Sequence, residues 1–334
     1  MRRVAPRCLK PSLMNYLSQL VDLMVQVMLP LSLLVGAGAL WPRFFGDTQV
    51  EVMRTSLNRM VMYLFYPCIL FAVASTTPIN RDLLSVPLLV GLASLVSGAV
   101  LYVLLYRLPL WRHLTDQTRA ALMLGGMFGN TFNIGVPVLV FFFGAEAMRY
   151  AVFNDMLMTM PLVWTLGVWI ATRLGSHDRN AAQPSVIGVM LTMPPIWAFL
   201  LGTACQQLNL TYEPLVNASR FIGQATIPVI IFVLGMTIPW RNLVPRGEIL
   251  TVVGIKLLLT PFIVWLIAPM IYSRMGDAQY AAVVEGTTPA MMTALLLADR
   301  FKLDSGAAAL LIGWSTILFW LTLPLIMAFG WVGR

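Results

Sequence analysis

The segment from Gly129 to Pro137 reads GNTFNIGVP and interrupts a hydrophobic stretch that is otherwise long enough to cross a membrane. Pro137 lacks a backbone N–H and its ring clashes with the preceding helical turn, while the glycines relax the backbone. The segment therefore predicts two half-helices with an unwound middle. Unwound backbone is tolerated at this depth only when it is buried in protein or lines a watery cavity. The break is thus a candidate binding site, and a second one is predicted at Glu285 to Pro289 (EGTTP).

Composition places the chain in a membrane. Hydrophobic residues make up 59% of it and charged residues 11%, with a mean hydropathy of +0.80. A soluble domain, with roughly a quarter of its residues charged, is excluded. At about 20 residues per span there is room for roughly ten helices. The predicted spans are Val21–Trp41, Met53–Ser75, Val86–Tyr106, Arg119–Phe143, Ala147–Ala171, Ser185–Gln206, Leu215–Ile238, Glu248–Tyr272, Gln279–Leu297 and Ser305–Ala328.

The distribution of Lys and Arg predicts the orientation of these spans. By the positive-inside rule, the side with more basic loops is cytoplasmic. The loops after odd-numbered spans hold eleven basic residues, against four in the even-numbered loops and at the C-terminus. This predicts a multi-pass protein of the cell inner membrane with both termini outside the cytoplasm, although the basic N-terminal tail runs against the pattern. The eleven are Arg43, Arg54, Arg107, Arg112, Arg119, Arg173, Arg179, Arg241, Arg246, Arg300 and Lys302, and the four are Arg81, Arg149, Arg274 and Arg334.

Features of the first half of the chain recur in the second. Span 2 contains Arg59 with Pro67 eight residues later, and span 7 contains Arg220 with Pro228 at the same distance. The broken spans are the fourth and the ninth, so each feature recurs five spans on. Because five is odd, the second copy enters the membrane from the opposite side, as in the inverted repeats of many secondary transporters. The alternative is chance, since proline is common in membrane helices.

The predicted fold is an all-α integral membrane protein. Ten transmembrane helices form two inverted five-helix repeats, with broken helices 4 and 9 crossing each other. The predicted organisation is a tail over residues 1–20, a first repeat over 21–173, a cytoplasmic linker over 174–184 and a second repeat over 185–334.

Several classes of function lack their sequence signature. The chain contains no GxxxxGK[ST] phosphate loop, no DDxxD-like acid pair and no HExxH zinc motif, and neither histidine lies in a predicted span. An ATP-driven pump, an intramembrane hydrolase, and a bound metal or other cofactor are therefore not expected. The widely spaced cysteines indicate no disulfide framework. The net charge of +8 comes from basic residues scattered through the loops, which argues against a nucleic-acid partner.

Polar side chains at the two breaks are candidates for binding a small carboxylate. The N-terminal end of each half-helix behaves like about half a positive charge and has free N–H groups that suit an anion. The alternative is that these side chains only satisfy the unwound backbone. The candidate residues are Asn130, Thr131, Asn133, Thr287 and Thr288, together with Gly135, Pro137 and Pro289, which form the breaks.

Three ionisable residues lie inside predicted spans: Asp155 in span 5, Lys256 in span 8 and Glu285 in span 9. A charge at this depth is costly and by default functional. Their positions along the spans separate Lys256 from either acid by roughly 10 Å or more in depth, so a direct ion pair is not expected. Three roles stay open: compensation of half-helix dipoles, coupling of a proton or sodium ion through either acid, and contact of Lys256 with the substrate.

Four runs of the sequence, which begin at Leu57, Gly129, Ala225 and Thr287, are specific in combination. Through them nearly the whole chain resembles the auxin efflux carrier family, and within it the bacterial malonate- and malate-type branch. The run GNTFNIGVPVLVFFFGAEAMRYAVFNDMLMTMPLVWTLGVW is similar to the fourth and fifth helices of that family. LNRMVMYLFYPCILFAVAS resembles its second helix, ATIPVIIFVLGMTI its seventh, and TTPAMMTALLLADRF its ninth.

The resemblance implies a fold and a function. Helices 1, 2, 6 and 7 would form a scaffold, and helices 3–5 with 8–10 a transport domain. Family members move indole acetic acid in plants and small dicarboxylates in bacteria, and the family also implies a homodimer through the scaffold. The short linker argues against plant-type control by phosphorylation. The first crossover would contain Asn130, Asn133 and Pro137, and the second Thr287, Thr288 and Pro289.

The sequence therefore predicts a secondary active transporter of a small organic anion rather than an enzyme. It would work by an elevator-type alternating-access mechanism, with the substrate at the crossing of helices 4 and 9. The alternatives are a sodium/proton exchanger of related fold and a transporter-like membrane receptor.

Overall fold

The structure, a computed structural model, describes residues 13–174, 188, 191–272 and 275–328. In this part the chain is helical, and its β-structure is limited to one isolated bridge. The start of the predicted tail (1–12) and the predicted linker from residue 175 to 184 lie outside the described residues.

Seven of the described helices are long and apolar enough to cross a membrane. They correspond to predicted spans 1, 2, 3, 5, 7, 8 and 10, so the all-helical membrane fold is confirmed, while the ten-helix count and the inverted repeat stay predictions. The seven are Ser18–Arg43, Thr48–Ala74, Arg81–Arg107, Ala145–Leu174, Glu213–Thr237, Gly247–Ile271 and Ser305–Ala328.

Most of these spans consist of consecutive α-helices joined by wider turns. The α-helices within the seven spans are α1 (Leu13–Leu23), α2 (Leu29–Leu40), α3 (Asp47–Met60), α4 (Tyr66–Ala74), α5 (Arg81–Tyr102), α8 (Met148–Asn154), α9 (Met160–Leu162), α12 (Glu213–Gly223), α13 (Thr226–Thr237), α14 (Gly247–Gly254), α15 (Thr260–Ile271) and α18 (Ser305–Ala328). The described parts of predicted spans 4, 6 and 9 contain shorter pieces, and residues 185–187, 189 and 190 of predicted span 6 lie outside the described residues. The shorter pieces are α6 (Asp116–Met127) with α7 (Val136–Phe143), α11 (Pro194–Gln207), and α16 (Asp277–Thr287) with α17 (Thr293–Arg300).

Prolines widen the spans at several places without ending them. A proline has no N–H and clashes with the carbonyl four residues back, and both problems are relieved by a wider, π-helical turn just before it. Such turns are Met24–Met28 before Pro30, Val61–Phe65 before Pro67, Thr131–Gly135 before Pro137, Asp155–Thr159 before Pro161 and Ile255–Leu259 before Pro261.

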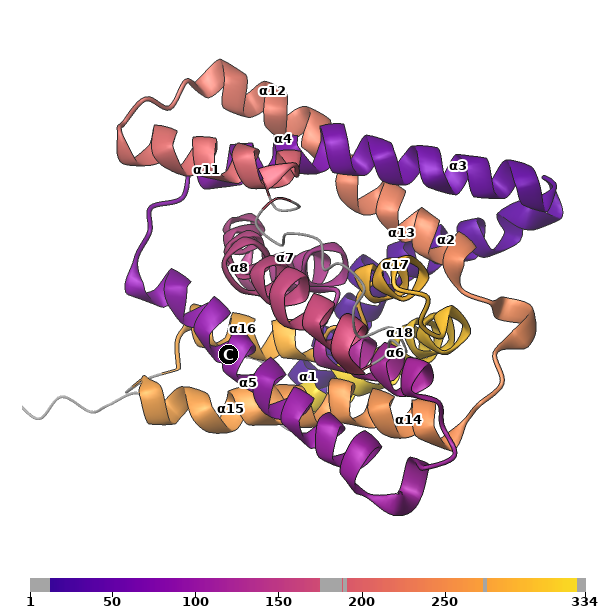
Figure 1. Cartoon of the computed structure of the whole chain (residues 1–334). Coiled ribbons are helices and arrows are strands. Elements are labelled where there is room, and N and C mark those ends of the chain that lie inside the picture. Colours follow the sequence, from indigo (N-terminus) through magenta and orange to yellow (C-terminus); the bar gives the residue numbers. More distant parts are fainter. Residues whose placement is uncertain (1–12, 175–187, 189–190, 273–274, 329–334) are drawn as a thin grey trace, which may run out of the picture.

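The helices pack in two groups. In the first, α2 packs on α13, and α4 packs on α11 and α12. In the second, α5 contacts α6, α8, α15 and α16, while α18 contacts α6 and α14. Figure 1 shows α3, α4, α11 and α12 together along one side of the molecule, with α5, α14 and α15 on the opposite side. The two broken segments, α6–α7 and α16–α17, lie between these two sides.

Glycines allow the closest helix crossing in the first group. A Cβ atom at Gly38 of α2 would fall on the carbonyl oxygen of Phe232 and lie 3.0 Å from the Cα of Gly235 in α13. The two backbones therefore touch where they cross, and any side chain at Gly38 would separate them. Small residues at such crossings are common in membrane helices because they let backbones approach.

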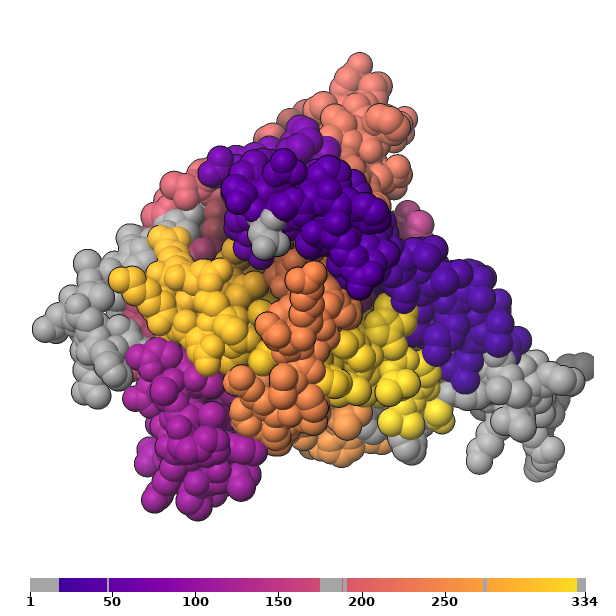
Figure 2. Space-filling model, turned by 90° about the vertical axis from the view of Figure 1, so that its right-hand side faces the viewer, coloured from indigo at the N-terminus to yellow at the C-terminus, as the bar shows by residue number. Residues whose placement is uncertain are grey.

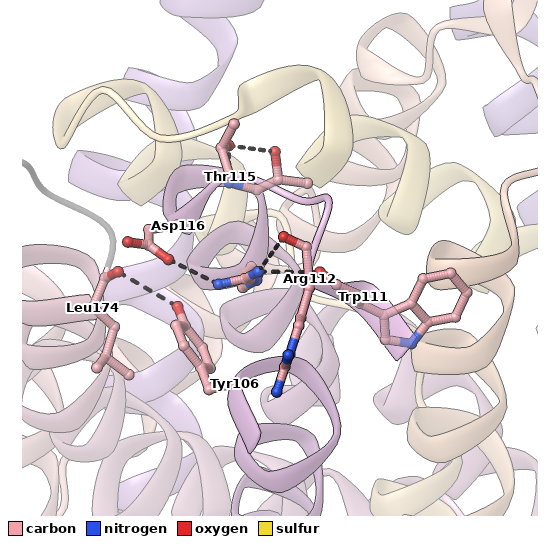
Figure 3. A network of polar contacts seen from close by, with 8 residues as sticks. Tyr106, Trp111, Arg112, Thr115, Asp116 and Leu174 are labelled. Carbon is pink, nitrogen blue, oxygen red and sulfur yellow. Dashed lines mark hydrogen bonds and ion pairs between the residues drawn. The ribbon is translucent and has the colours of Figure 1, made fainter. Parts of the chain in front are cut away.

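The start of the first broken helix is anchored at the protein surface (Figure 3). The side chain of Thr115 caps α6 by accepting a hydrogen bond from the N–H of Thr118 at 3.2 Å. Arg119 forms an ion pair with Asp116 at 3.1 Å and donates to two carbonyls of the preceding loop. The Thr118 hydroxyl donates to Asp304, just before α18, at 2.8 Å. These contacts hold the N-terminal end of α6 against the loop that precedes α18.

The glycine crossing predicts the effect of a single methyl group. We expect Gly38→Ala to lower the free energy of unfolding by about 1–3 kcal/mol, the usual cost of overpacking, because its Cβ meets rigid backbone. Gly36→Ala is the matched control: it lies on the same helix and its Cβ would have no atom within 4 Å. Thermal unfolding of the purified protein in detergent measures both. Equal melting temperatures for the two variants would contradict the proposed crossing.

Candidate functional site

The two breaks lie against each other and share their backbone hydrogen bonds. Gly129 and Ala290 form an antiparallel bridge. The N–H of Asn130 donates to the carbonyl of Pro289 at 2.7 Å, and the N–H of Met291 donates to the carbonyl of Phe128 at 3.2 Å. Each break therefore satisfies the backbone of the other, which is what unwound chain inside a membrane requires.

The boundaries of the breaks differ from those predicted. The first break covers only residues 128–130 and is followed by the turn Thr131–Gly135, so Pro137 lies inside helix, at the second position of α7. Proline is tolerated there because the wider turn Thr131–Gly135 just before it relieves the clash with the preceding carbonyl and the missing N–H. The second break begins at Thr288, and Glu285 remains within α16. A residue before proline is forced into extended backbone, and Thr288 accordingly has ψ of 143°.

Gly129 has no room for a side chain. A Cβ atom there would fall on the hydroxyl of Thr288 and lie 3.0 Å from the Nζ of Lys256. Only glycine lets the two chains and the lysine approach in this way. Ser315 of α18 supports the other strand of the bridge, because its hydroxyl accepts a hydrogen bond from the N–H of Ala290 at 3.1 Å.

A cavity of about 440 Å³ leads from the surface to this crossing. That volume falls in the range of sites for small organic molecules. The buried end of the cavity is lined by Gly129, Asn130, Thr131, Asn133 and Asp155. The amide of Asn133 donates to the side-chain oxygen of Asn130 at 2.8 Å, so the two asparagines form one polar surface.

The exposed end of the cavity lies at the face of the odd-numbered loops. Its lining there includes Glu51 and Arg54 of α3, and Asp299 near the end of α17. Arg54 forms an ion pair with Glu51 at 2.8 Å. Figure 2 shows this face, with the violet helix α3 above the orange segment that follows α13 and the gold end of α17. Arg59 lines the wall between the two ends.

Asp155 connects the buried end of the cavity to span 2. The hydroxyl of Tyr66 donates to one carboxylate oxygen of Asp155, and the hydroxyl of Thr131 donates to the other at 3.4 Å. Asp155 is buried, with 5% of its surface exposed. Both of its oxygens therefore have donors, one from the first packing group and one from the crossing itself.

Glu285 lies behind the crossing, outside the cavity lining. It is completely buried, and the amide of Asn154 donates to its Oε2 at 3.3 Å. Its Oε1 has no hydrogen-bond partner and is directed toward Gly135, where a Cβ atom would lie 2.9 Å away. Buried polar atoms normally have a partner, so this carboxylate oxygen needs an explanation.

Lys256 is held by backbone. Its ammonium donates to the carbonyl of Gly286, in the last turn of α16, at 3.0 Å. Cations are favoured at the C-terminal end of a helix, where carbonyl groups lack intrahelical partners. Among the residues that the structure describes, no acid lies within 4.0 Å of this ammonium.

The structure brings together part of the predicted site. Asn130, Thr131, Asn133 and Asp155 line the cavity. Thr287 and Thr288 lie outside the lining, and their hydroxyls donate to the carbonyls of Val284 and Glu285 in α16 at 2.7 Å each. The others also lie outside the lining: Gly135, Pro137, Pro289, Lys256 and Glu285.

Three contributing residues were missed by the sequence analysis. Tyr66 directly precedes Pro67, and Asn154 directly precedes Asp155, so each lies beside a residue that had been singled out. A search for polar side chains next to intramembrane prolines and charges would have found both. Ser315 has no such neighbour, and only the packing of α18 reveals it.

Comparison with known proteins identifies the family. A family model described as membrane transport protein matches residues 23–327, most of the chain. The chain belongs to this family of membrane transport proteins. The resemblance to auxin efflux carriers is thereby supported at the level of the family. A relative named as an uncharacterized transporter of Methanothermobacter thermautotrophicus is 28% identical over 277 residues, covering 81% of this chain and 87% of the relative.

A second relative, also named as an uncharacterized transporter, comes from Methanocaldococcus jannaschii. It is 25% identical over 303 residues, which cover 87% of this chain and 92% of the relative. The family and these names indicate a multi-pass membrane transporter rather than an enzyme.

The space around Gly129 predicts a second mutational effect. Gly129→Ala should lower the free energy of unfolding by about 1–3 kcal/mol, because its methyl group meets the hydroxyl of Thr288. Adding Thr288→Ala removes that hydroxyl and should recover part of the loss, so the two effects are not additive. Gly254→Ala, with no atom within 4 Å of its Cβ, serves as the control. Additive losses, measured by thermal unfolding in detergent, would show that the two residues do not touch.

Proposed function

We propose that the protein is a secondary active transporter of a small organic anion, such as a dicarboxylate of the malonate or malate type. The anion would bind at the buried end of the cavity, where the two broken helices cross. The observation that carries this proposal is the geometry of that place: two helix breaks bonded to each other at the end of a cavity that opens on one face.

The chemistry of the buried end suits a carboxylate. Asn130 and Asn133 carry amide groups, and Thr131 a hydroxyl, at the cavity wall. The helical turn starting at Thr131 and helix α17, starting at Thr293, both begin at the cavity. Their first N–H groups favour negative charge. Arg59, farther out along the wall, would offer a second positive group to a dianion.

An elevator-type movement fits the two packing groups. The broken helices pack with α5, α8, α15 and α18, while α2, α4, α11, α12 and α13 pack among themselves. In the proposed mechanism the group that contains the crossing shifts against the other and carries the anion with it. The contact of Tyr66 with Asp155 joins the two groups and would have to open in that movement. If the odd-numbered loops are cytoplasmic, the cavity opens to the inside.

A cation exchanger of related fold is the second candidate. The observation that favours it is the position of Asp155, a buried carboxylate that lines the cavity. Such a protein would move sodium ions or protons with no organic anion present.

The inner-membrane location, the external termini and the homodimer stay predictions.

Transport assays test the proposal. We expect proteoliposomes that contain the purified protein to take up labelled malonate or malate. Asn130→Ala should lower uptake at low substrate concentration by about tenfold or more, since a hydrogen bond to a charged group contributes about 1.5–3 kcal/mol. The backbone N–H of residue 130 still bonds Pro289, so the variant should fold.

Two comparisons make this assay decisive. Asn217→Ala changes an exposed asparagine on α12 and should leave uptake unchanged. Uptake equal to wild type in Asn130→Ala would refute the assignment of the site. Sodium or proton flux in the absence of any organic anion would favour the exchanger.

A further inference from the structure

We infer that Glu285 and Asn154 form a buried proton-binding site, separate from the anion cavity, through which the transporter couples anion movement to protons. The inference rests on the proposed function and deepens it by assigning the coupling ion and its residues. It starts from atoms that the crossing leaves without partners.

Two acceptor oxygens lie unpaired at this place. Glu285 and Asn154 are each completely buried, and their side chains touch through the hydrogen bond from the amide nitrogen to Oε2. The other oxygen of each residue, Oε1 of Glu285 and Oδ1 of Asn154, has no hydrogen-bond donor. An unsatisfied buried acceptor costs about 1–3 kcal/mol, and more when it is charged. The carboxylate oxygen is the more costly of the two because it carries charge, and it therefore points to an occupant with a positive charge or a donor.

The charge balance of the crossing points the same way. Among the described residues, the buried charged side chains are Asp155, Lys256 and Glu285. Two carboxylates and one ammonium leave a net charge of −1 when all three are ionised. An uncompensated charge is expensive at this depth, and an organic anion in the cavity adds more negative charge. One bound proton brings the three groups to neutrality.

Of the two acids, Glu285 is the one available for this role. Both oxygens of Asp155 already accept hydrogen bonds, from Tyr66 and Thr131. Glu285 has only the single bond from Asn154. A proton on Oε1 occupies a lone pair that the protein leaves unused. A proton on Asp155 would instead compete at an oxygen that already accepts a hydrogen bond, from Tyr66 or from Thr131.

The surroundings of Glu285 contain few other charges. Helix α16 packs against α5, α7, α8, α15 and α18 and against the turns Thr131–Gly135 and Ile255–Leu259. From these elements and the turn next to α8, the charged groups that act on Glu285 are Lys256 and Asp155, and the titratable hydroxyl of Tyr66, which is bonded to Asp155, also interacts with it. Lys256 is engaged with a backbone carbonyl and leaves Oε1 without a donor.

A proton fits this pair better than a metal cation. A hard metal cation takes about six or more oxygen ligands, whereas a proton needs one free lone pair. The amide nitrogen of Asn154, directed at Glu285, is a donor and would oppose a metal ion at Oε2. The pair also lies close to the cavity along the chain, since Asp155 lines the cavity and directly follows Asn154.

Glu285→Gln tests the assignment, because glutamine is uncharged at every pH and keeps the shape of the side chain. In proteoliposomes, the wild type should accumulate labelled malonate when an inward proton gradient is imposed. Glu285→Gln should lose this accumulation, with the inside-to-outside ratio falling to about one. It should still exchange labelled internal for unlabelled external malonate, since exchange requires no net proton movement.

A second measurement follows the proton directly. In weakly buffered detergent solution with a pH dye, malonate binding should draw about one proton per protein from solution in the wild type and none in Glu285→Gln. Glu213→Gln, at an exposed acid of α12, is the matched control and should behave as wild type in both assays. Asp155→Asn should transport more slowly but keep its dependence on the proton gradient.

The outcomes separate this inference from the proposed function. Proton-driven accumulation that survives in Glu285→Gln overturns the assignment of Glu285, whatever the behaviour of Asp155→Asn. Accumulation driven by a sodium gradient at constant pH overturns the assignment of the proton. A wild type that neither accumulates nor exchanges any organic anion overturns the proposed function, and the inference with it.

Discussion

Backbone hydrogen bonding inside the bilayer is the constraint on which the rest of this structure depends. A helix that breaks in hydrocarbon leaves N–H and C=O groups that lipid cannot satisfy. Here the backbones of the breaks at Gly129 and Ala290 bond each other through a short antiparallel bridge. The hydroxyl of Ser315 accepts a hydrogen bond from the N–H of Ala290. The two broken helices are therefore bound together at their weakest points. A polar, irregular stretch of chain can then persist at the end of a cavity, where ordinary membrane helices would offer only apolar side chains.

The prolines place the ionisable groups around this crossing. The π-helical turns before Pro161 and Pro261 contain Asp155 and Lys256, and Tyr66 directly follows the turn before Pro67. A wider turn shifts the angular position of the residues in it relative to a regular α-helix, and such turns are frequent at functional sites. The same covalent feature that interrupts backbone hydrogen bonding thus also aims polar side chains into the centre of the bundle.

The sequence was sufficient to locate the two breaks, because glycine, proline and amide side chains are out of place in an apolar helix. It was not sufficient to predict where the breaks begin and end. Pro137 and Glu285 lie in helices, while Phe128 and Met291 take part in the bridge. The pairing of these two acids with their donors was also beyond its reach. The bonds from Tyr66 to Asp155 and from Asn154 to Glu285 join residues 89 and 131 positions apart, and no local pattern encodes such a pairing.

The position of Lys256 fits the proposed change of charge at the crossing. A lysine bound directly to a buried carboxylate forms a pair that is costly to separate, since removing one partner exposes the other as an uncompensated charge. In this structure the ammonium is held by the carbonyl of Gly286, near the acids but not within 4.0 Å of either. Its charge lessens the repulsion between the two carboxylates without forming an ion pair with either of them. In the proposed mechanism Glu285 therefore gains or loses a proton while the backbone bridge stays closed, so that the charge of the site alternates and its geometry does not.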